Sequence, residues 1–215
     1  MTGSDLLTLL MSRLGNRSET ALRATCLSEM TLIQETLEQS ATLPWFLISE
    51  ELSAVTPSDG VERRVAVPAG FLREVDEGAL VIIDSDGDSH VLEKYDYDAC
   101  IAKYGRDETS TLPEAYALVG DYFHLFPIPT VELTLYIHCY QEDDAPADNS
   151  TENQWLKYAS DLLMAKTGKV VAGRHLRNTE LETLFTADIP PAENRLYVNN
   201  VARAEANRDR QMGES

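Results

Sequence analysis

The most prominent candidate for chemistry is an acidic turn at residues 84–88, which read Asp-Ser-Asp-Gly-Asp. A calcium-binding EF-hand loop has glycine at its sixth position and glutamate at its twelfth. Counted from Asp84, the glycine is fourth and the twelfth residue is Tyr95. An Asp-Gly pair between two strand-like runs is instead a strong signal for a β-hairpin. The sequence therefore predicts a charged hairpin tip at this position.

Paired carboxylates at residues 50–51, 96/98 and 143–144 have the residue types needed for acid–base catalysis. Such catalysis needs two carboxylates in unlike environments, one of which is usually buried. These pairs lie in polar stretches that we expect to be solvated, so they predict no catalytic dyad. The basic run at residues 173–177 is likewise typical of a solvated helix end.

The three cysteines, Cys26, Cys100 and Cys139, are far apart and form no CxxC pair. Isolated cysteines of this kind predict reduced thiols, and the four histidines show none of the spacings of a zinc site. The sequence also lacks GxSxG and Walker motifs. We therefore expect no catalytic residue, no cofactor and no bound metal, and we interpret the protein as a non-enzyme.

Charge is distributed unevenly along the 215 residues, whose formal net charge is −18. Residues 1–40 carry −2, residues 41–150 carry −16 from 6 basic and 22 acidic side chains, and residues 151–215 are neutral. Nucleic-acid wrapping requires lysine and arginine against phosphates, so this balance disfavours it. The distribution indicates an acidic module inserted between two flanks of different character.

The composition favours a folded protein that does not cross a membrane. Apolar residues make up 43% of the chain and charged residues 25%, which is typical of a packed globular core. No apolar run approaches the roughly 18 residues that a membrane span needs. The N-terminal residues lack the basic stretch and the cleavage site of a signal peptide, so we expect none.

The first flank has the pattern of two helices. Ser4 is a candidate cap for a short leucine-rich helix that ends at Gly15, and Ser18 is a candidate cap for a longer one. The longer helix carries one apolar stripe at helical spacing, formed by Leu22, Cys26, Met30, Ile33 and Leu37.

The middle segment changes to the period of β-strands. Its strand-like runs are residues 44–49, 63–68, 71–75, 79–84, 90–95, 115–120, 122–126 and 131–140, with one short helix at 96–104. In the last run, apolar and polar residues alternate, which predicts one buried face. Residues 126–129 (FPIP) should separate the last two strands because proline removes ladder donors. Short strands at this spacing predict a small antiparallel sandwich or barrel.

The C-terminal flank returns to helical patterns. Thr151 with Gln154 fits a capping box, and Lys166 with Gly168 should end that helix. A further helix is expected around 178–186, after which Pro190 and Pro191 should break the chain. Residues 192–212 have few large apolar side chains and are expected to order only on a partner.

Together these patterns predict an α+β fold. Residues 1–40 and 151–189 should form a small α-helical bundle, and residues 41–150 an inserted acidic antiparallel β module. Residues 190–215 should form an extended or helical C-terminal arm that binds a partner.

Four stretches carry a resemblance to a known family. They are residues 43–48 (LPWFLI) after a helix, 64–74 (RVAVPAGFLRE), 116–127 (YALVGDYFHLFP) with 133–137 (LTLYI), and 153–156 (NQWL). The first resembles the family's segment that follows the helix, and the second its strand, P-x-x-F-L-R turn and strand. The third resembles its Y-x-x-x-G hairpin with the long strand that follows, and the fourth its helix that returns to the bundle. This set resembles the head–tail connector, or adaptor, proteins of tailed bacteriophages.

The resemblance implies a structural protein of the virion. Connectors of this kind form a ring, usually of twelve copies, beneath the portal, with a helical core, a β insertion and a C-terminal arm. The implied partners are the portal protein, tail or nozzle proteins and further copies of this chain, while DNA passes through without sequence-specific binding. The implied location is the virion neck, after synthesis in the cytoplasm of the bacterial host.

Within that picture, the arm is the candidate portal-binding site. Its basic residues have the charge to pair with acidic groups on a portal, and its apolar residues would anchor the contact. The candidates are Arg195, Leu196, Tyr197, Val201, Arg203, Arg208 and Arg210. The acidic module has a separate use, because a wall of negative charge repels phosphates and lets DNA slide.

Other interpretations stay open at this point. The protein could be another ring of the neck or tail, such as a stopper or a tail terminator, although helices at both ends disfavour those mostly β proteins. It could also be a non-viral binding module or an enzyme with an acidic β module. An enzyme should place convergent polar groups in a cleft, and the sequence supplies no clustered candidates.

Overall fold

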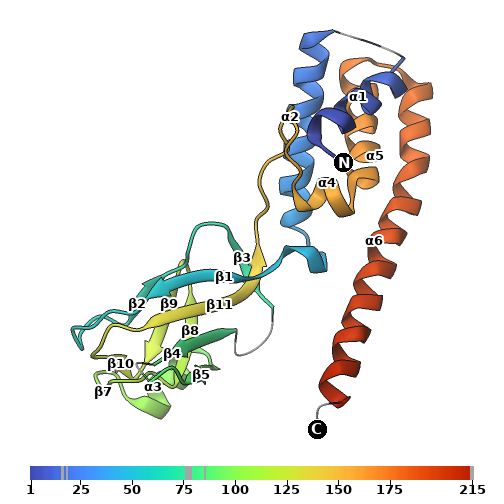
Figure 1. Ribbon diagram of the computed structural model, residues 1–215. Helices are drawn as coiled ribbons and strands as arrows, with labels where there is room; N and C mark the ends of the chain where they lie inside the picture. Colours follow the sequence, from blue (N-terminus) through green and yellow to red (C-terminus); the bar gives the residue numbers. More distant parts are fainter. Residues whose placement is uncertain (16, 18, 76–78, 85, 214–215) are drawn as a thin grey trace. The chain divides into compact units, whose positions relative to one another are not determined.

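The computed structural model describes residues 1–215 except 16, 18, 76–78, 85 and 214–215; the side chains of 50, 51 and 204–213 are also outside the description. The chain divides into a helical unit, residues 1–47 with 143–215, and a β unit, residues 48–142 (Figure 1). This is an α+β fold, as predicted. The unit boundaries lie at 48 and 142, whereas the sequence analysis placed them at 41 and 150.

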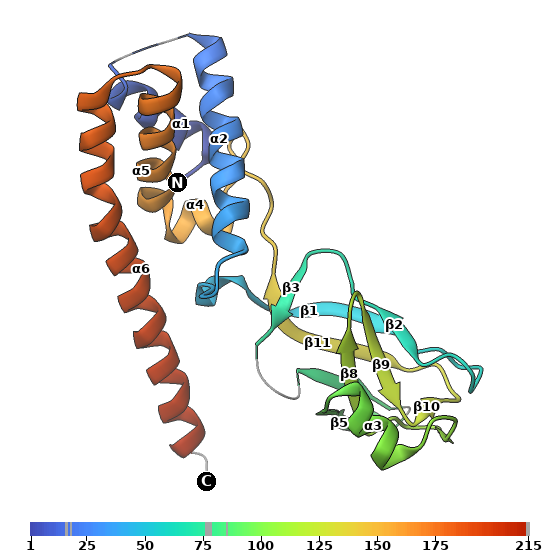
Figure 2. The same cartoon turned by 180° about the vertical axis from the view of Figure 1, so that it is seen from behind.

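The helical unit draws its helices from both ends of the chain (Figure 2). Its elements are α1 (Gly3–Arg13), α2 (Thr20–Glu38), the 3₁₀ turn η1 (Trp45–Leu47), α4 (Gln154–Tyr158), α5 (Ser160–Val170), the π-helical turn η2 (Val171–His175) and α6 (Thr179–Gly213). Within the described residues, no helix combines the length and apolar character that crossing a membrane requires.

Two helix starts differ from the predicted ones. α1 is capped by Thr2, whose hydroxyl accepts a hydrogen bond from the Asp5 amide while the Thr2 amide donates to the Asp5 carboxylate, so Ser4 is not the cap. α4 is capped by Asn153, whose side chain accepts from the Leu156 amide at 2.7 Å, so Thr151 is not the cap. The predicted cap Ser18 lies outside the described residues.

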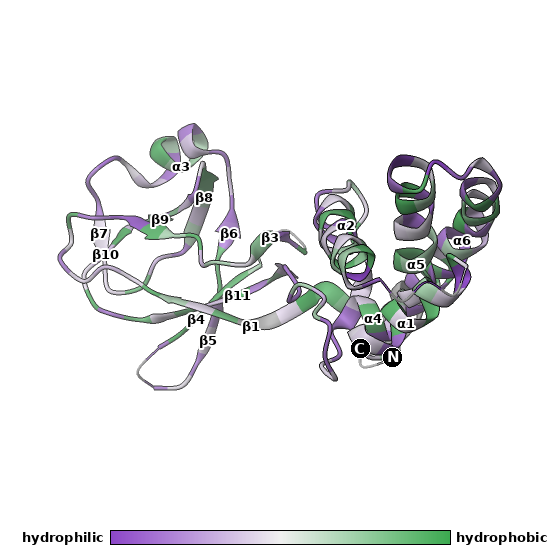
Figure 3. Cartoon of the chain, turned by 90° about the horizontal axis from the view of Figure 1, so that it is seen from above, coloured by the Kyte–Doolittle hydropathy of each residue, from purple (hydrophilic) through white to green (hydrophobic). Residues whose placement is uncertain are grey.

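The apolar stripe of α2 is confirmed in its first half and wrong in its second. Leu22, Cys26 and Met30 are buried, as predicted, but the next buried positions are Gln34 and Glu38. The predicted Ile33 and Leu37 are only partly buried. Figure 3 shows hydrophobic and hydrophilic residues mixed around α2, α5 and α6, as in helices that bury one face.

The buried polar end of α2 joins the two flanks of the chain. Glu38 accepts from the Trp155 indole N–H at 2.7 Å and from the Gln34 amide at 3.0 Å. Asn153 donates to the Gln34 side chain at 3.0 Å and to the Asp144 carbonyl at 2.6 Å. We call Gln34, Glu38, Asn153 and Trp155 the polar clamp. It holds the chain where the return segment from the β unit meets α2.

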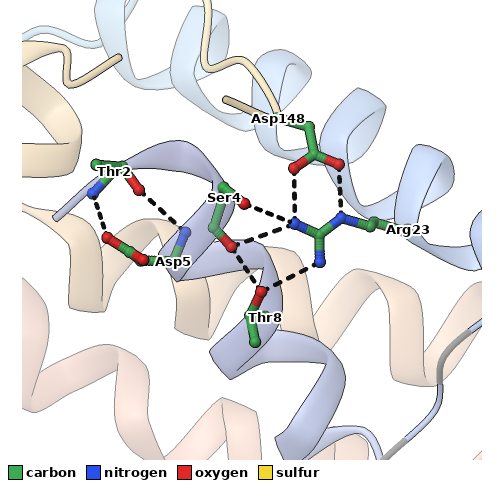
Figure 4. Close-up of polar contacts among 6 residues, drawn as sticks. All are labelled: Thr2, Ser4, Asp5, Thr8, Arg23 and Asp148. Atoms are coloured by element: carbon green, nitrogen blue, oxygen red, sulfur yellow. Dashed lines mark hydrogen bonds and ion pairs between the residues drawn. The ribbon is translucent and has the colours of Figure 1, made fainter. Parts of the chain in front are cut away.

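A second polar contact fixes the predicted acidic linker, residues 141–150, to the helices. The Arg23 guanidinium donates two hydrogen bonds to the Asp148 carboxylate, of 2.5 and 2.6 Å (Figure 4). It also donates to the Ser4 carbonyl at 3.2 Å. The Arg23 pair lowers the pKa of Asp148. The linker is therefore attached along α1 and α2, whereas its composition indicated a solvated stretch.

The predicted end of α5 at Lys166 and Gly168 is wrong, because Gly168 serves packing instead. A Cβ atom at Gly168 would lie 2.3 Å from the Phe185 ring, so glycine lets α6 approach α5 closely. α5 continues to Val170 and then through η2, which contains the basic run 173–177 up to His175.

The predicted break at Pro190 and Pro191 is also wrong, because α6 runs through both prolines. An internal proline removes a helix hydrogen bond and crowds the preceding turn. Here the helix is held on both sides of the prolines. Phe185 and Ala192 are buried, and the Glu193 carboxylate accepts from Lys166 of α5 at 2.7 Å. Tertiary packing therefore overrides the local preference.

The β unit contains short strands and one helix. Its elements are β1 (Ile48–Val55), β2 (Arg64–Ala66), β3 (Phe71–Glu74), β4 (Leu80–Ile83), β5 (Ser89–Val91), β6 (Glu93–Lys94), α3 (Tyr97–Tyr104), β7 (Thr109–Ser110), β8 (Ala115–Val119), β9 (Tyr122–Phe126), β10 (Ile128–Pro129) and β11 (Thr134–Gln141). The run 44–49 was predicted as strand throughout, but residues 45–47 form η1 in the helical unit.

Two sheets carry most of the strands. One has the order β1-β11-β4-β5, with β3 also on β11, and the other has the order β2-β9-β8-β6. Most neighbours are antiparallel, as predicted, but β6–β8 and β10–β7 are parallel. The segment predicted to separate two strands contributes β10 itself, and Pro129 is its last residue.

The core of the β unit lies between these sheets. Leu135, Ile137 and Cys139 of β11 are fully buried and pack with Phe123 of β9, which confirms the predicted alternation within β11. Val131, at the start of the predicted strand and on the same predicted face, is exposed and precedes β11. β4 and β5 form the predicted antiparallel hairpin, with Val81 opposite Val91 and Ile83 opposite Ser89.

Replacing Glu38 with alanine tests the polar clamp. The Trp155 indole and the Gln34 amide would lose a buried acceptor, so we expect the free energy of unfolding to fall by about 2 kcal/mol. Glu35→Ala, on the exposed face of the same helix, is the matched control and should change it by less than about 0.5 kcal/mol. Urea unfolding followed by helical circular dichroism measures both, and equal effects would contradict the clamp.

Asp143 makes stability depend on pH. Its carboxylate accepts from the Trp155 amide at 3.1 Å, and partial burial raises its pKa. The folded state therefore holds a proton there more tightly than the unfolded state, so this group destabilises the fold as pH rises through that pKa. We expect Asp143→Asn to gain stability relative to wild type as pH rises above the ordinary aspartate pKa of about 4. Urea unfolding across pH measures this, and a relative loss over that range would contradict it.

Candidate partner-binding helix

The candidate portal-binding residues lie on α6, and the structure sorts them onto different faces of that helix. Leu196 and Asn200 are partly buried and Arg203 contacts Trp45, whereas Tyr197 and Val201 are exposed. The described members of the predicted set therefore differ in their exposure and contacts.

Arg195 and Leu196 belong to the packing of the helical unit. The Arg195 guanidinium forms an ion pair with Asp161 of α5, with Nε 2.8 Å from the carboxylate. Leu196 is partly buried. These contacts hold α6 against the bundle, while the Arg195 side chain stays 63% exposed.

Arg203 is also engaged within the helical unit. Its guanidinium lies over the Trp45 ring, 4.4 Å from the centroid, and Asn200 accepts from the Trp45 amide at 3.1 Å. The Trp45 ring in turn contacts Tyr158 of α4, with ring centroids 4.9 Å apart. A cation over an indole face is a favourable contact, so the far part of α6 is fixed to η1.

The outward face of α6 remains apolar. Tyr197 is 63% exposed, and Val198 and Val201 beside it are also exposed. We call these three residues the outer face of α6. Val198 was not among the predicted residues, although its position three before Val201 would have indicated a shared face. Arg208 and Arg210 have side chains outside the described residues.

The β unit is a second surface of distinctive chemistry. Residues 48–142 contain 19 acidic and 6 basic side chains, a net charge of −13. Three of those cations are already paired, Arg64 with Glu62, Lys94 with Glu74 and Lys103 with Glu93. Six cations cannot neutralise 19 carboxylates, so the surface of this unit is strongly negative.

The cysteines have the environment of core residues. Cys26, Cys100 and Cys139 are free and fully buried. Burial raises the pKa of Cys26 and of Cys139 to about 11, and it raises the pKa of Cys100 as well. These thiols are therefore protonated at neutral pH. Among the described residues, no group of three or more histidine, cysteine or acidic side chains could hold a metal ion.

The sequence analysis missed the residues that attach the flanks to each other. A signal was present, since Cys26, Met30, Gln34 and Glu38 recur at a strict spacing of four and continue a buried stripe with polar side chains. The Arg23–Asp148 pair had no such signal, because its partners are far apart in sequence.

Replacing a side chain by alanine should have different effects on the two faces of α6. Arg203→Ala removes the contact with Trp45, so we expect backbone amides near residues 197–203 to exchange with deuterium about tenfold faster. Tyr197→Ala, on the outer face, is the matched control and should leave their exchange unchanged. Hydrogen–deuterium exchange with mass spectrometry measures both, and similar protection in the two variants would contradict the assignment of faces.

No protein-family pattern matches the sequence of this chain, and no curated protein matches it. The candidate surfaces therefore rest on the chain's own residues: the outer face of α6 in the helical unit and the acidic surface of the β unit.

Proposed function

We propose that this protein is a head–tail connector of a tailed bacteriophage, a ring-forming structural protein that docks beneath the portal and joins the capsid to the tail. The observation that carries the proposal is the two-sided character of α6. Its inner side is fixed to the bundle by Arg195 and Arg203, and its outer face exposes Tyr197, Val198 and Val201. A long helix held in this way presents a prepared apolar strip to a partner.

The chain's organisation supports the same role. Both ends of the sequence build the helical unit, and the β unit is inserted between α2 and α4. This is the order of elements that the resemblance to connector proteins implied. We propose a non-catalytic role, with the portal, tail proteins and further copies of the chain as partners, and with the virion neck as its location.

The acidic β unit has a use in such a ring. Its net charge of −13 would repel the phosphates of passing DNA, so the duplex would slide past without binding. A neutral or basic channel surface in the assembled ring would contradict this part of the proposal.

Mass photometry of the full chain, mixed with the portal protein encoded by the same genome, tests the function. We expect the portal to gain the mass of a ring of about twelve copies. Tyr197→Asp combined with Val201→Asp should weaken this association at least about tenfold, because charges would be placed in an apolar contact. The matched control is Leu184→Asp, an exposed position at the start of the same helix.

Point substitutions are preferable to removal of residues 192–215. Ala192 is buried and Arg195 and Arg203 bind the bundle, so a truncation would disturb folding as well as docking. Undiminished portal binding by the outer-face variant, or no association of wild type with the portal, would overturn the proposal.

A further inference from the structure

The helical unit contains a pocket that neither the fold nor the outer face of α6 explains. It has a volume of about 600 Å³ and lies among α2, α5, η2 and α6. Ile33 and Ile189 supply apolar walls, and its charged lining residues are Lys166, Lys169, Arg174 and Glu182. Three cations and one carboxylate give this lining a net positive charge, in a chain whose net charge is −18.

Two of the three cations are available to a ligand. Lys166 is already paired with Glu193 at 2.7 Å. Within the described part of the chain, Lys169 and Arg174 have no hydrogen-bond or ion-pair partner. Glu182 packs closely against the backbone of η2, since a Cβ at Gly173 would lie 2.8 Å from its carboxyl carbon. The pocket therefore presents an ammonium and a guanidinium beside apolar walls.

This chemistry suits carboxylates on a protein segment. Lysine and arginine bind carboxylates through charge-assisted hydrogen bonds, and arginine can do so with two parallel bonds. A nucleic-acid backbone would need a longer basic stripe on a positively charged protein. The pocket contains its own carboxylate, Glu182, and belongs to an acidic chain, so an acidic peptide segment fits it better than a nucleic acid does.

The β unit of a second copy supplies such a segment at the β4–β5 turn. The Asp84 carboxylate accepts from the Asp86 and Asp88 amides, both at 2.9 Å, and lies 2.7 Å from His90 Nε2. These bonds fix the backbone of Asp86 and Asp88 relative to Asp84. The side chains of Asp86 and Asp88 are exposed, and in the described residues neither has a partner. Two free carboxylates thus match two free cations.

We infer that the pocket of one copy binds Asp86 and Asp88 of a neighbouring copy through Lys169 and Arg174. The contact joins two different surfaces, and a contact of that kind closes into a ring when its rotation allows. It gives the proposed connector ring a lateral interface, and in that respect it rests on the proposed function. The pairing itself does not involve the outer face of α6.

Charge exchange between the two surfaces tests the contact. The pocket variant carries Lys169→Glu with Arg174→Glu, and the hairpin variant carries Asp86→Lys with Asp88→Lys. Each variant alone brings like charges together, so we expect self-association of the full chain, measured by sedimentation velocity, to weaken at least about tenfold. An equimolar mixture should associate like wild type, because each surface then meets its complement. Added salt should weaken the wild-type contact.

Matched controls separate this contact from a general charge effect. Arg17→Glu, in the helical unit, and Asp107→Lys, in the β unit, each reverse one charge of the same sign at exposed positions outside the pocket and hairpin. They should leave association unchanged. Circular dichroism confirms folding of each variant, and the mixture would in any case reveal a specific pairing.

The outcomes distinguish this inference from the proposed function. If the pocket variant and the hairpin variant each still form rings on the portal, the inference is overturned and the proposed function stands. If the mixture of the two variants associates like wild type but the wild-type chain does not bind the portal, the inference is supported and the proposed function fails. A wild-type chain that remains monomeric with and without portal would overturn the inference. Binding of a short DNA duplex that is lost in the pocket variant would also overturn it, in favour of a phosphate site.

Discussion

The polar clamp at the end of α2 is the constraint on which the helical unit depends. Glu38 and Gln34 occupy buried positions where a simple amphipathic helix would place apolar side chains, and their partners Asn153 and Trp155 come from the other flank. A buried polar group is costly unless it is paired. The polar groups of the clamp are therefore paired only when both flanks are folded together. The clamp thus couples the folding of the N-terminal helices to that of the segment after residue 142.

Contacts between distant residues also explain how α6 stays helical through its two prolines. Two internal prolines would break an isolated helix, yet Phe185 packs against Gly168 and Lys166 binds Glu193 on either side of them. Further along, Arg195 and Arg203 continue the attachment to α5 and η1. These contacts supply stability that the sequence of α6 lacks as far as Arg203, and they leave Tyr197, Val198 and Val201 exposed.

Local patterns in the sequence were sufficient for the fold class and for much of the β unit. The alternation of Leu135, Ile137 and Cys139 and the Asp-Gly hairpin have short periods and strong turn chemistry, so they were predictable. The clamp, the Arg23–Asp148 pair and the helix through Pro190 depend on contacts between distant residues. The contacts of Arg195 with Asp161 and of Arg203 with Trp45 were not predictable for the same reason, because their partners are distant in sequence.

Native-state hydrogen exchange across denaturant concentrations tests most directly whether the two ends of the chain form one unit. The clamp predicts that amides of α2 and α5 open in a single cooperative step, with the same free energy and the same dependence on denaturant. Glu38→Ala should lower both together. Opening of α2 at a distinctly lower free energy, with α5 still protected, would show that the flanks fold separately and would contradict the account.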